Sequence, residues 1–349
     1  MTITLPFWYV LAIVVSSLSL IFFIFQSTTA KIIIKGFDYN AMIGAILAGG
    51  YGKRLKPITD HIPKALVEIT DNYTIMDRQL FDFKNIGIRD VYILSGYLSE
   101  VIEERYKNYR DMNIHYLREE KPMGTLFSLS NLMKNIDDDA IVRNGDTVTD
   151  INFKNFVDFS ISRNYDMVMF VTKMQSPYGI VEFSGDKVDN FREKPQLDHY
   201  INAGMYYIKK SAFNAFFRKY MEKDIEKSVF PYLVNNNRMG VYCEDALWLG
   251  IDSEKDLKTI KEMYNGRKDT SYGYSKILYE DNGKIIKEHY IRAGEKVEIP
   301  PGRILKIDSG VGYIDDNTAK KYVPGQVVKL EKKITVLAHE NSIIEEIFI

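Results

Sequence analysis

The sequence predicts an α/β protein: a Rossmann-like, mostly parallel sheet with helices on both faces, followed by a small all-β domain. Three observations support this prediction. Between residues 43 and 263, apolar runs typical of buried strands alternate with segments whose apolar residues recur at helical spacing. The first apolar run ends in a glycine-rich loop, where α/β sheets bind their ligands. After residue 275, short strand-like runs are divided by turn residues.

The alternating segments define the expected elements. Strands are expected at residues 43–47, 91–94, 114–117, 140–142, 167–171 and 179–183. Helices are expected at 98–106, 125–134, 211–221 and 254–263, and one more should follow Thr74 as N-cap and end near residue 85, before Gly87. Strands separated by helices favour a parallel sheet that is covered on both faces.

Residues 265–349 are expected to form a second domain. Turn residues such as Asn282-Gly283 and Pro324-Gly325 separate its short strands, which indicates a small barrel or sandwich. This region loosely resembles a cupin. Cupin metal sites need clustered histidines, and here only His289 and His339 occur. A metal-free structural or regulatory domain is therefore favoured over a second active site.

Composition excludes some classes of function. The net charge of −1 gives no global basic field for nucleic acid. The single cysteine, Cys243, excludes an internal disulfide or a CxxC metal site, and it fits a reducing compartment.

Residues 1–41 are predicted to be a membrane anchor and linker. Residues 5–25 carry no charge and, as a helix with about 1.5 Å per residue, would match the thickness of a bilayer core. The first charges, Lys31 and Lys35, follow this segment, so the positive-inside rule predicts a cytoplasmic catalytic domain. An alternative stays open: Met42 directly precedes the first strand and could be the true start.

The glycine-rich loop is predicted to bind an anion. Leu47 and Ala48 lead into Gly49, Gly50 and Gly52, and a backbone without Cβ atoms can turn its N–H groups toward a phosphate. The cations Lys53, Arg54 and Lys56 follow at once. The glycine spacing fits neither the dinucleotide fingerprint nor the ATPase phosphate loop.

The whole string from Leu47 to Thr59 is more specific, because it resembles the signature of the sugar-1-phosphate nucleotidyltransferases, or NDP-sugar pyrophosphorylases. Pro63-Lys64-Ala65-Leu66 resembles the second element of that family. The resemblance implies a nucleotidyltransferase domain over residues 42–264. In the implied reaction, the phosphate of a sugar 1-phosphate attacks the α-phosphorus of an NTP and pyrophosphate leaves.

The resemblance also implies catalytic residues. Arg54 and Lys64 match the signature cations, and Asp146 in Asn144-Gly145-Asp146 resembles the Asp that binds Mg²⁺. The second metal carboxylate departs from the pattern. Relatives carry Asp two residues after a Trp, followed by Ile-Gly, whereas here Gly and Asp are exchanged in Trp248-Leu249-Gly250-Ile251-Asp252. Asp252 is thus either a metal ligand or the cap of the following helix.

Substrate recognition is implied by further segments. The sugar-phosphate residues would be Tyr178, Gly179, Glu193, Lys194, Asn202 and Gly204, and the segment from Glu119 to Gly124 resembles the nucleobase segment. Thymidylyl- and uridylyltransferases generally place Gln at the position of Glu119. A carboxylate suits the two adjacent donors of guanine, so Glu119 favours GTP.

The prediction is therefore a Mg²⁺-dependent enzyme that resembles mannose-1-phosphate guanylyltransferases, with an NTP and a sugar 1-phosphate as its binding partners. One alternative is a glucose-1-phosphate thymidylyl- or uridylyltransferase. Another is a non-catalytic regulator that senses a sugar nucleotide. The sequence leaves the oligomeric state open, with a homo-oligomer among the alternatives.

Overall fold

The computed structural model describes residues 39–315 and 319–348. From Asn40 onward the chain forms one compact unit. Over the described ranges, no helix has the length and apolar character needed to cross a bilayer. The predicted anchor at residues 5–25 lies outside these ranges and stays a prediction.

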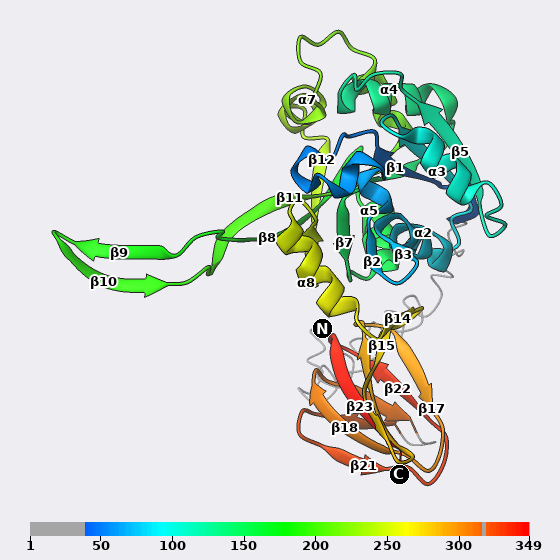
Figure 1. Ribbon diagram of the computed structural model, residues 1–349, viewed down its shortest axis with the longest axis vertical. Coiled ribbons are helices and arrows are strands. Elements are labelled where there is room, and N and C mark those ends of the chain that lie inside the picture. Colours follow the sequence, from blue (N-terminus) through cyan, green and yellow to red (C-terminus); the bar gives the residue numbers. More distant parts are fainter. Residues whose placement is uncertain (1–38, 316–318, 349) are drawn as a thin grey trace, which may run out of the picture. The chain divides into compact units, whose positions relative to one another are not determined.

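A seven-stranded sheet forms the centre of the first part of the chain, in the order β12-β8-β11-β6-β1-β4-β5 (Figure 1). Neighbouring strands are parallel, except that β11 runs antiparallel to β6 and β8. The predicted mostly parallel sheet is confirmed. Its strands are β1 (Ile43–Ala48), β4 (Asp90–Ser95), β5 (Asn113–Arg118), β6 (Ala140–Asn144), β8 (Met167–Gln175), β11 (Gln196–Ile208) and β12 (Met239–Cys243).

Helices cover both faces of this sheet, since successive residues of a strand point to opposite faces. Ala45 of β1 joins a buried cluster with α4, α6 and α7. A Cβ on the neighbouring Gly44 would lie 3.2 Å from the Phe83 ring of α2, on the other face. The helices are α2 (Ile75–Ile86), α3 (Ser99–Tyr106), α4 (Thr125–Asn135), α5 (Phe153–Ser162), α6 (Phe213–Phe216), α7 (Val229–Asn235) and α8 (Glu254–Tyr264).

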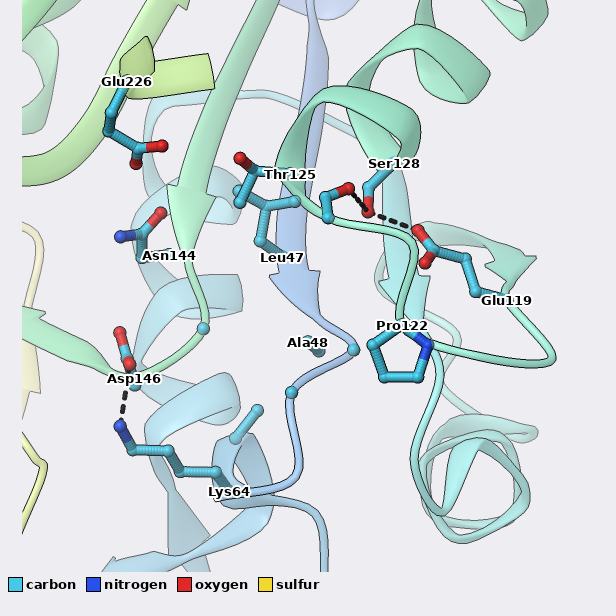
Figure 2. A pocket seen from close by; sticks show the side chains of 15 residues that line it. Leu47, Ala48, Lys64, Glu119, Pro122, Thr125, Ser128, Asn144, Asp146 and Glu226 are labelled. Carbon is cyan, nitrogen blue, oxygen red and sulfur yellow. Dashed lines mark hydrogen bonds and ion pairs between the residues drawn. The ribbon is translucent and has the colours of Figure 1, made fainter. Parts of the chain in front are cut away.

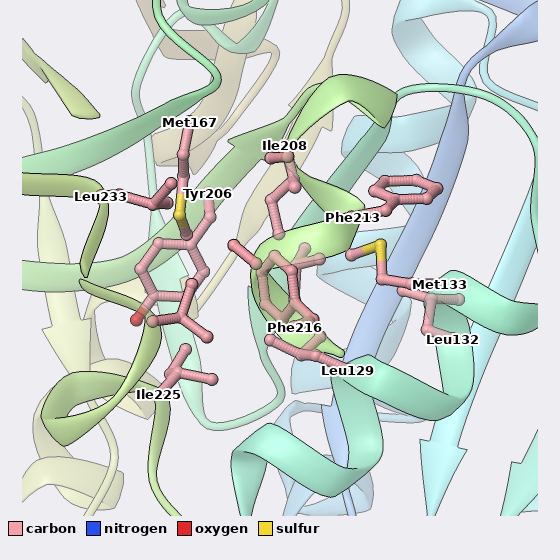
Figure 3. Packing of buried hydrophobic residues seen from close by; sticks show 14 of the residues in the cluster. Leu129, Leu132, Met133, Met167, Tyr206, Ile208, Phe213, Phe216, Ile225 and Leu233 are labelled. Carbon is pink, nitrogen blue, oxygen red and sulfur yellow. The ribbon is translucent and has the colours of Figure 1, made fainter. Parts of the chain in front are cut away.

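Apolar packing holds α4 and α6 on the sheet (Figure 3). Leu129 and Leu132 of α4 lie beside Phe213 and Phe216 of α6, and Tyr206 of β11 belongs to the same cluster. Burying such side chains contributes about 1.5–3 kcal/mol each. This packing fixes α4, whose first turn lines the cavity described below.

Three two-stranded sheets accompany the central sheet: β2 (Glu68–Thr70) with β3 (Tyr73–Thr74), β7 (Thr147–Thr149) with β13 (Trp248–Gly250), and β9 (Ile180–Ser184) with β10 (Lys187–Arg192). The β7–β13 pair matters for the site, because it joins the turn after β6 to the segment before α8.

The last part of the chain consists of antiparallel sheets, as the short-strand pattern predicts. One has six strands, in the order β14-β15-β16-β23-β18-β21, and the other has four, in the order β17-β22-β19-β20. Apolar side chains that include Ile299, Leu305 and Val336 form a buried core here. The likeness to a cupin stays a prediction. The strands are β14 (Arg267–Thr270), β15 (Gly273–Asp281), β16 (Lys284–Ile291), β17 (Lys296–Ile299), β18 (Ile304–Ser309), β19 (Gly312–Asp315), β20 (Ala319–Tyr322), β21 (Val327–Lys329), β22 (Ile334–Ala338) and β23 (Ser342–Phe348).

A buried charge cluster joins α2 to the start of this region. Its members are Arg78, Asp82, Arg143, Asp150, Arg267 and Asp269. Asp82 pairs with Arg78 and lies 2.6 Å from Arg143 Nη1. Burial disfavours the Asp82 carboxylate, yet the two guanidinium groups hold its pKa below the usual value. Three positive charges thus balance three negative ones within this cluster.

Most predicted elements agree with the structure, and one does not. Thr74 caps α2 in a capping box with Asp77, and Gly87 ends that helix in the left-handed conformation. The predicted helix at 211–221 is wrong beyond α6, because Phe217 lies in a turn and the chain from there to Met221 is not helical. The strand predicted at 179–183 exists as β9, but it pairs with β10 outside the central sheet.

Candidate active site

The loop after β1 begins at the carboxyl edge of the sheet. Gly52 there has φ 61°, and a Cβ on it would lie 2.9 Å from the Thr59 side chain. The Thr59 hydroxyl donates a hydrogen bond of 2.9 Å to the Gly52 carbonyl. At Gly50, by contrast, an added Cβ would meet no atom within 4 Å. Glycine is needed at position 52 because the backbone there is left-handed and closely packed. At position 50, glycine leaves the space beside the loop free of protein atoms.

That space belongs to a cavity of about 290 Å³ (Figure 2). Its walls come from the ends of β1 and β6, the segment at Lys64, the first turn of α4 and Glu226. The lining residues are Leu47, Ala48, Gly49, Gly50, Lys64, Ala65, Glu119, Pro122, Gly124, Thr125, Ser128, Asn144, Gly145, Asp146 and Glu226. Eight predicted nucleotide-binding and catalytic residues therefore surround one cavity.

A second cavity of about 200 Å³ adjoins the first, because both are lined by Gly50, Lys64 and Asp146. Its remaining walls are Gly52, Lys53, Arg54, Leu55 and Asp252. This smaller cavity therefore combines the predicted phosphate-binding cations with both predicted metal carboxylates.

Strand pairing brings the two carboxylates together. Gly250 of β13 lies opposite Thr147 of β7, and the Ile251 amide donates to the Asp146 carbonyl at 2.9 Å. Lys64 Nζ then donates to Asp146 Oδ2 at 2.7 Å and to Asp252 Oδ1 at 2.6 Å. Figure 2 shows Lys64 directed toward Asp146 beneath the loop after β1. One ammonium group thus bridges carboxylates that are distant in the sequence.

The side chain of Asp252 does not cap α8. The N-cap is Ser253, whose hydroxyl accepts from the Asp256 amide in a capping box. The Asp252 carboxylate instead contacts Lys64 and, at 2.9 Å, Arg54 Nη2. Despite the exchange of Gly and Asp in the sequence, a carboxylate still lies beside Asp146.

The turn that carries Asp146 is held from two sides. A Cβ on Gly145 would lie 2.6 Å from the Leu47 carbonyl, so only glycine lets the turn approach β1 this closely. From α2, the buried Gln79 amide donates to the carbonyls of Asn144 and Thr147, at 2.8 and 2.9 Å. Sequence reasoning missed Gln79, since nothing in its local pattern separates it from an ordinary helix residue.

The segment around Glu119 forms another wall. Glu119 is buried, and its carboxylate accepts from the Met123 amide at 3.0 Å and from the Ser128 hydroxyl. A carboxylate offers about four acceptor sites, so capacity remains for a ligand. Gly124 has φ 97°, and a Cβ there would lie 2.8 Å from the Lys223 carbonyl.

The close approach of Lys223 to Gly124 brings Glu226 to the cavity, a residue that the sequence analysis did not predict. The Leu126 amide donates to the Lys223 carbonyl, and the Ile225 amide donates to the Thr125 hydroxyl. The exposed Glu226 follows, and Figure 2 shows its carboxylate near Asn144 at the cavity. About a hundred residues separate Glu226 from its neighbours in α4, so no local motif could reveal it.

The predicted sugar-phosphate residues do not line either cavity. Tyr178, Gly179, Glu193 and Lys194 lie at the base of the β9–β10 hairpin. There a Cβ on Gly179 would meet Glu193 Oε2 at 3.2 Å. Asn202 and Gly204 lie on β11, where a Cβ on Gly204 would lie 2.6 Å from the Asn144 amide nitrogen.

Of the other two cations that follow the glycine loop, Lys53 lines the smaller cavity. Lys56 instead pairs with Asp60 at 2.7 Å, and this hydrogen bond raises the pKa of Lys56. Lys56 lines neither of the two cavities.

The donor set at Asp146 and Asp252 fits Mg²⁺. Within the described part of the chain, no three His, Cys, Asp or Glu side chains gather as a metal cage. Mg²⁺ does not require one, since it is usually held by one or two carboxylates together with substrate phosphates. Both carboxylates are partly exposed to the smaller cavity, with 38% and 40% of their side-chain surface accessible.

A glycine-rich loop, clustered cations and paired carboxylates lie together at one sheet edge, an arrangement that fits an enzyme acting on phosphates. Residues 43–277 match the Nucleotidyl transferase family, so the chain belongs to it. The mannose-1-phosphate guanyltransferase of Candida albicans is 28% identical over 276 residues, covering 75% of this chain and 73% of that protein. The mannose-1-phosphate guanylyltransferase catalytic subunit beta of Danio rerio is 30% identical and covers 64% of each chain.

Solved structures share the fold. A putative glucose-1-phosphate thymidylyltransferase from Bacillus anthracis superposes with a TM-score of 0.51 at 18% identity, over 64% of this chain and 94% of that chain. HddC from Yersinia pseudotuberculosis, complexed with GMP-PN, gives 0.50 at 23% identity, over 64% of this chain and 99% of that one. The matches cover the nucleotidyltransferase fold and leave about a third of this chain unmatched.

Proposed function

We propose that this chain transfers a guanylyl group from GTP to mannose 1-phosphate, releasing pyrophosphate and forming GDP-mannose. The observation that carries the proposal is the bridge from Lys64 to Asp146 and Asp252, directly below the glycine loop. Further support comes from the likeness to mannose-1-phosphate guanylyltransferases at about 30% identity.

In this proposal, the loop from Gly49 to Gly52 holds the triphosphate through its amides. Arg54 neutralises the β- and γ-phosphates, while Lys64 contacts the α-phosphate or the incoming sugar phosphate. An oxygen of the sugar phosphate forms a bond to the α-phosphorus as the bond to the leaving pyrophosphate breaks. No protein nucleophile is required, so the contribution of the enzyme is alignment and charge stabilisation.

Asp146 and Asp252 are the residues that would hold Mg²⁺. Bound there, the ion would neutralise charge on the phosphate oxygens during transfer. The ammonium of Lys64 and the guanidinium of Arg54 offset the charges of the two carboxylates, which keeps them close despite their mutual repulsion.

Choice of GTP rests on Glu119. Its carboxylate lines the larger cavity and retains acceptor capacity beside its bonds to Met123 and Ser128. Guanine presents two adjacent donors to such a group, whereas a pyrimidine imide presents a donor beside carbonyl oxygens. Tyr178, Gly179, Glu193, Lys194, Asn202 and Gly204 are proposed to contact the sugar phosphate.

The test is pyrophosphate release from each NTP combined with each sugar 1-phosphate, with Mg²⁺ and with EDTA. The proposal expects the GTP and mannose 1-phosphate pair to react fastest, and EDTA to abolish release. A preference for dTTP or UTP with glucose 1-phosphate would support the alternative specificity. Tight binding of a GDP-sugar without pyrophosphate release from any pair would support a sensor.

Two variants link the reaction to the site. Asp146→Asn should fold normally and lose turnover by about 100-fold or more. Asp111→Asn removes a surface carboxylate that also pairs with a lysine, Lys84, and should leave turnover unchanged. Equal turnover in the two variants would contradict the assignment of Asp146.

A further inference from the structure

Ser128 lies in the first turn of α4, and its side chain lines the larger cavity. Its hydroxyl donates to Glu119 Oε1, as the dashed line between the two residues in Figure 2 marks. Neither the sequence analysis nor the proposed function gives this serine a role. Its position beside the carboxylate that is proposed to contact the base suggests one.

The Glu119 side chain is held at three points. Its amide donates to the carbonyl of Ser95, the last residue of β4, at 2.9 Å, which fixes the backbone at the sheet edge. The Met123 amide donates to Oε2 at 3.0 Å, and the Ser128 hydroxyl donates to Oε1. The last torsion of a glutamate is otherwise soft, so these two bonds set the plane of the carboxylate.

The two internal donors bind different oxygens of Glu119, and this division decides what a ligand can use. A carboxylate has about four acceptor sites, two on each oxygen. With one site taken on Oε1 and one on Oε2, each oxygen keeps about one site for a ligand. Guanine, with N1–H beside its 2-amino group, can use both oxygens. Hypoxanthine, which has N1–H but no 2-amino group, can use only one.

The Ser128 hydroxyl has a second acceptor within reach, the Gly124 carbonyl at 3.2 Å. That carbonyl already accepts from the amides of Phe127 and Ser128, at 3.1 and 3.2 Å. A hydrogen bond to a charged acceptor is roughly twice as strong as one between neutral groups. The single hydrogen of the hydroxyl is therefore directed to Glu119.

We propose that Ser128 is a positioning residue that gives the site its preference for the 2-amino group of guanine. The inference rests on the proposed function, in which Glu119 contacts the base. Among the described residues, Oε1 accepts a hydrogen bond from Ser128 alone, whereas the Met123 amide holds Oε2. Without the hydroxyl, the carboxylate can turn about its bond to Met123. The contact through Oε2 then remains, and the contact through Oε1 is lost.

The experiment is calorimetric titration of the full chain with GTP and with ITP, in the presence of Mg²⁺. No sugar 1-phosphate is added, so no transfer takes place and the titration reports affinity. ITP is GTP without the 2-amino group. The unmodified chain should bind GTP about tenfold more tightly than ITP, because ITP leaves one carboxylate oxygen unpaired. In Ser128→Ala the affinity for GTP should fall by about tenfold and the affinity for ITP should change little.

Two further variants separate positioning from a general structural role. Ser130→Ala removes a hydroxyl from the same helix, one that donates to the Phe216 carbonyl at 2.8 Å and lines neither cavity. It should keep the ratio of GTP to ITP affinity. Glu119→Gln should lose the ratio, since an amide offers only one acceptor oxygen. Adding Ser128→Ala to Glu119→Gln should then change nothing more, because Ser128 acts through the carboxylate.

The inference is overturned if Ser128→Ala keeps the ratio of the unmodified chain, or if Ser130→Ala loses it equally. It is also overturned if Ser128→Ala lowers the ratio further in the Glu119→Gln background, since Ser128 would then contact the base itself. These results leave the proposed function in place. A ratio that is unchanged in Glu119→Gln, or tighter binding of UTP or dTTP than of GTP by the unmodified chain, would instead refute the proposed choice of base.

Discussion

Lys64 Nζ lies 2.6 Å from Asp252 Oδ1, which links a residue that follows the glycine loop to one that precedes α8. The sequence separation is 188 residues, and the β7–β13 pair makes the contact possible. The same ammonium group binds Asp146. The contact therefore places Asp252 beside Asp146 in the candidate site, although its sequence context departs from the pattern of the family.

The first prediction separates a role of Asp252 in the site from a role in the helix. Asp252→Asn should lower turnover by about 100-fold, because it weakens the carboxylate pair proposed to hold Mg²⁺. It should leave the stability of the fold nearly unchanged. The measurements are steady-state kinetics as a function of Mg²⁺ and urea unfolding.

The matched control is Ser253→Ala at the neighbouring position. This variant removes the N-cap of α8 and should cost about 1 kcal/mol of stability with turnover retained. If Asp252→Asn destabilised the protein while Ser253→Ala abolished turnover, the two roles would be reversed and the assignment would be wrong.

The second prediction concerns the free space at Gly50. Gly50→Ala adds one methyl group where no protein atom lies within 4 Å, so folding should be unaffected. Because Gly50 lines both cavities, the added methyl group should raise the KM for the NTP by about tenfold, which corresponds to roughly 1.4 kcal/mol. Initial rates against NTP concentration, together with a melting curve, check this. An unchanged KM would mean that the triphosphate binds elsewhere.

Much of the fold could be predicted because its signals are local. The apolar run of β1, the Thr74 cap and the Gly87 terminus each lie within a few residues of the element they define. The helix predicted at 211–221 was wrong because its apolar residues belong to one short helical turn in the core. Phe213 and Phe216, for example, are the two ends of α6. Spacing alone cannot tell where such a turn stops.

Part of the candidate site could also be predicted, because some of its residues belong to a local motif. Arg54 and Lys64 follow the glycine loop closely, so a local motif contains them. Glu226 and Gln79 reach the site through long-range contacts, namely the approach of Lys223 to Gly124 and the bonds across to Thr147. Contacts of that kind depend on the packing of whole elements, which no short pattern encodes.

The third prediction tests Gln79 as a positioning residue. Gln79→Met keeps the length of the side chain but removes the two bonds to the carbonyls of Asn144 and Thr147. The Asn144 carbonyl keeps the Thr147 hydroxyl as a donor, so the cost is that of two lost buried hydrogen bonds, about 1–3 kcal/mol of stability. Because the turn between them carries Asp146, the Mg²⁺ concentration needed for half-maximal activity should also rise.

The Mg²⁺ dependence of activity is the measurement that tests whether Gln79 positions the turn. A loss of stability alone is what any buried polar residue would give. If the melting temperature fell while the Mg²⁺ dependence stayed at that of the unmodified chain, Gln79 would support the fold without positioning the turn.

The fourth prediction concerns the buried charges on α2. The pKa of Asp82 is lowered by Arg78 and Arg143, which outweigh the effect of its burial. A carboxyl group with a lowered pKa in the folded state stabilises the protein above its unfolded pKa, near 3.8. This contribution is lost as the pH falls through the folded-state pKa. Stability should therefore decline on the acid side of about pH 4.

Asp82→Asn keeps the shape of the side chain and removes its charge, which leaves Arg78 and Arg143 without this buried partner. We expect a loss of about 3–5 kcal/mol at pH 7, measured by urea unfolding. The difference from the unmodified chain should shrink below about pH 4, because there the Asp82 carboxyl of the unfolded chain takes up a proton before that of the folded chain does, and the stabilisation by its charge declines. A difference that stayed constant from pH 7 to pH 3 would show that the cost is steric, and that the ion pairs of Asp82 do not stabilise this cluster.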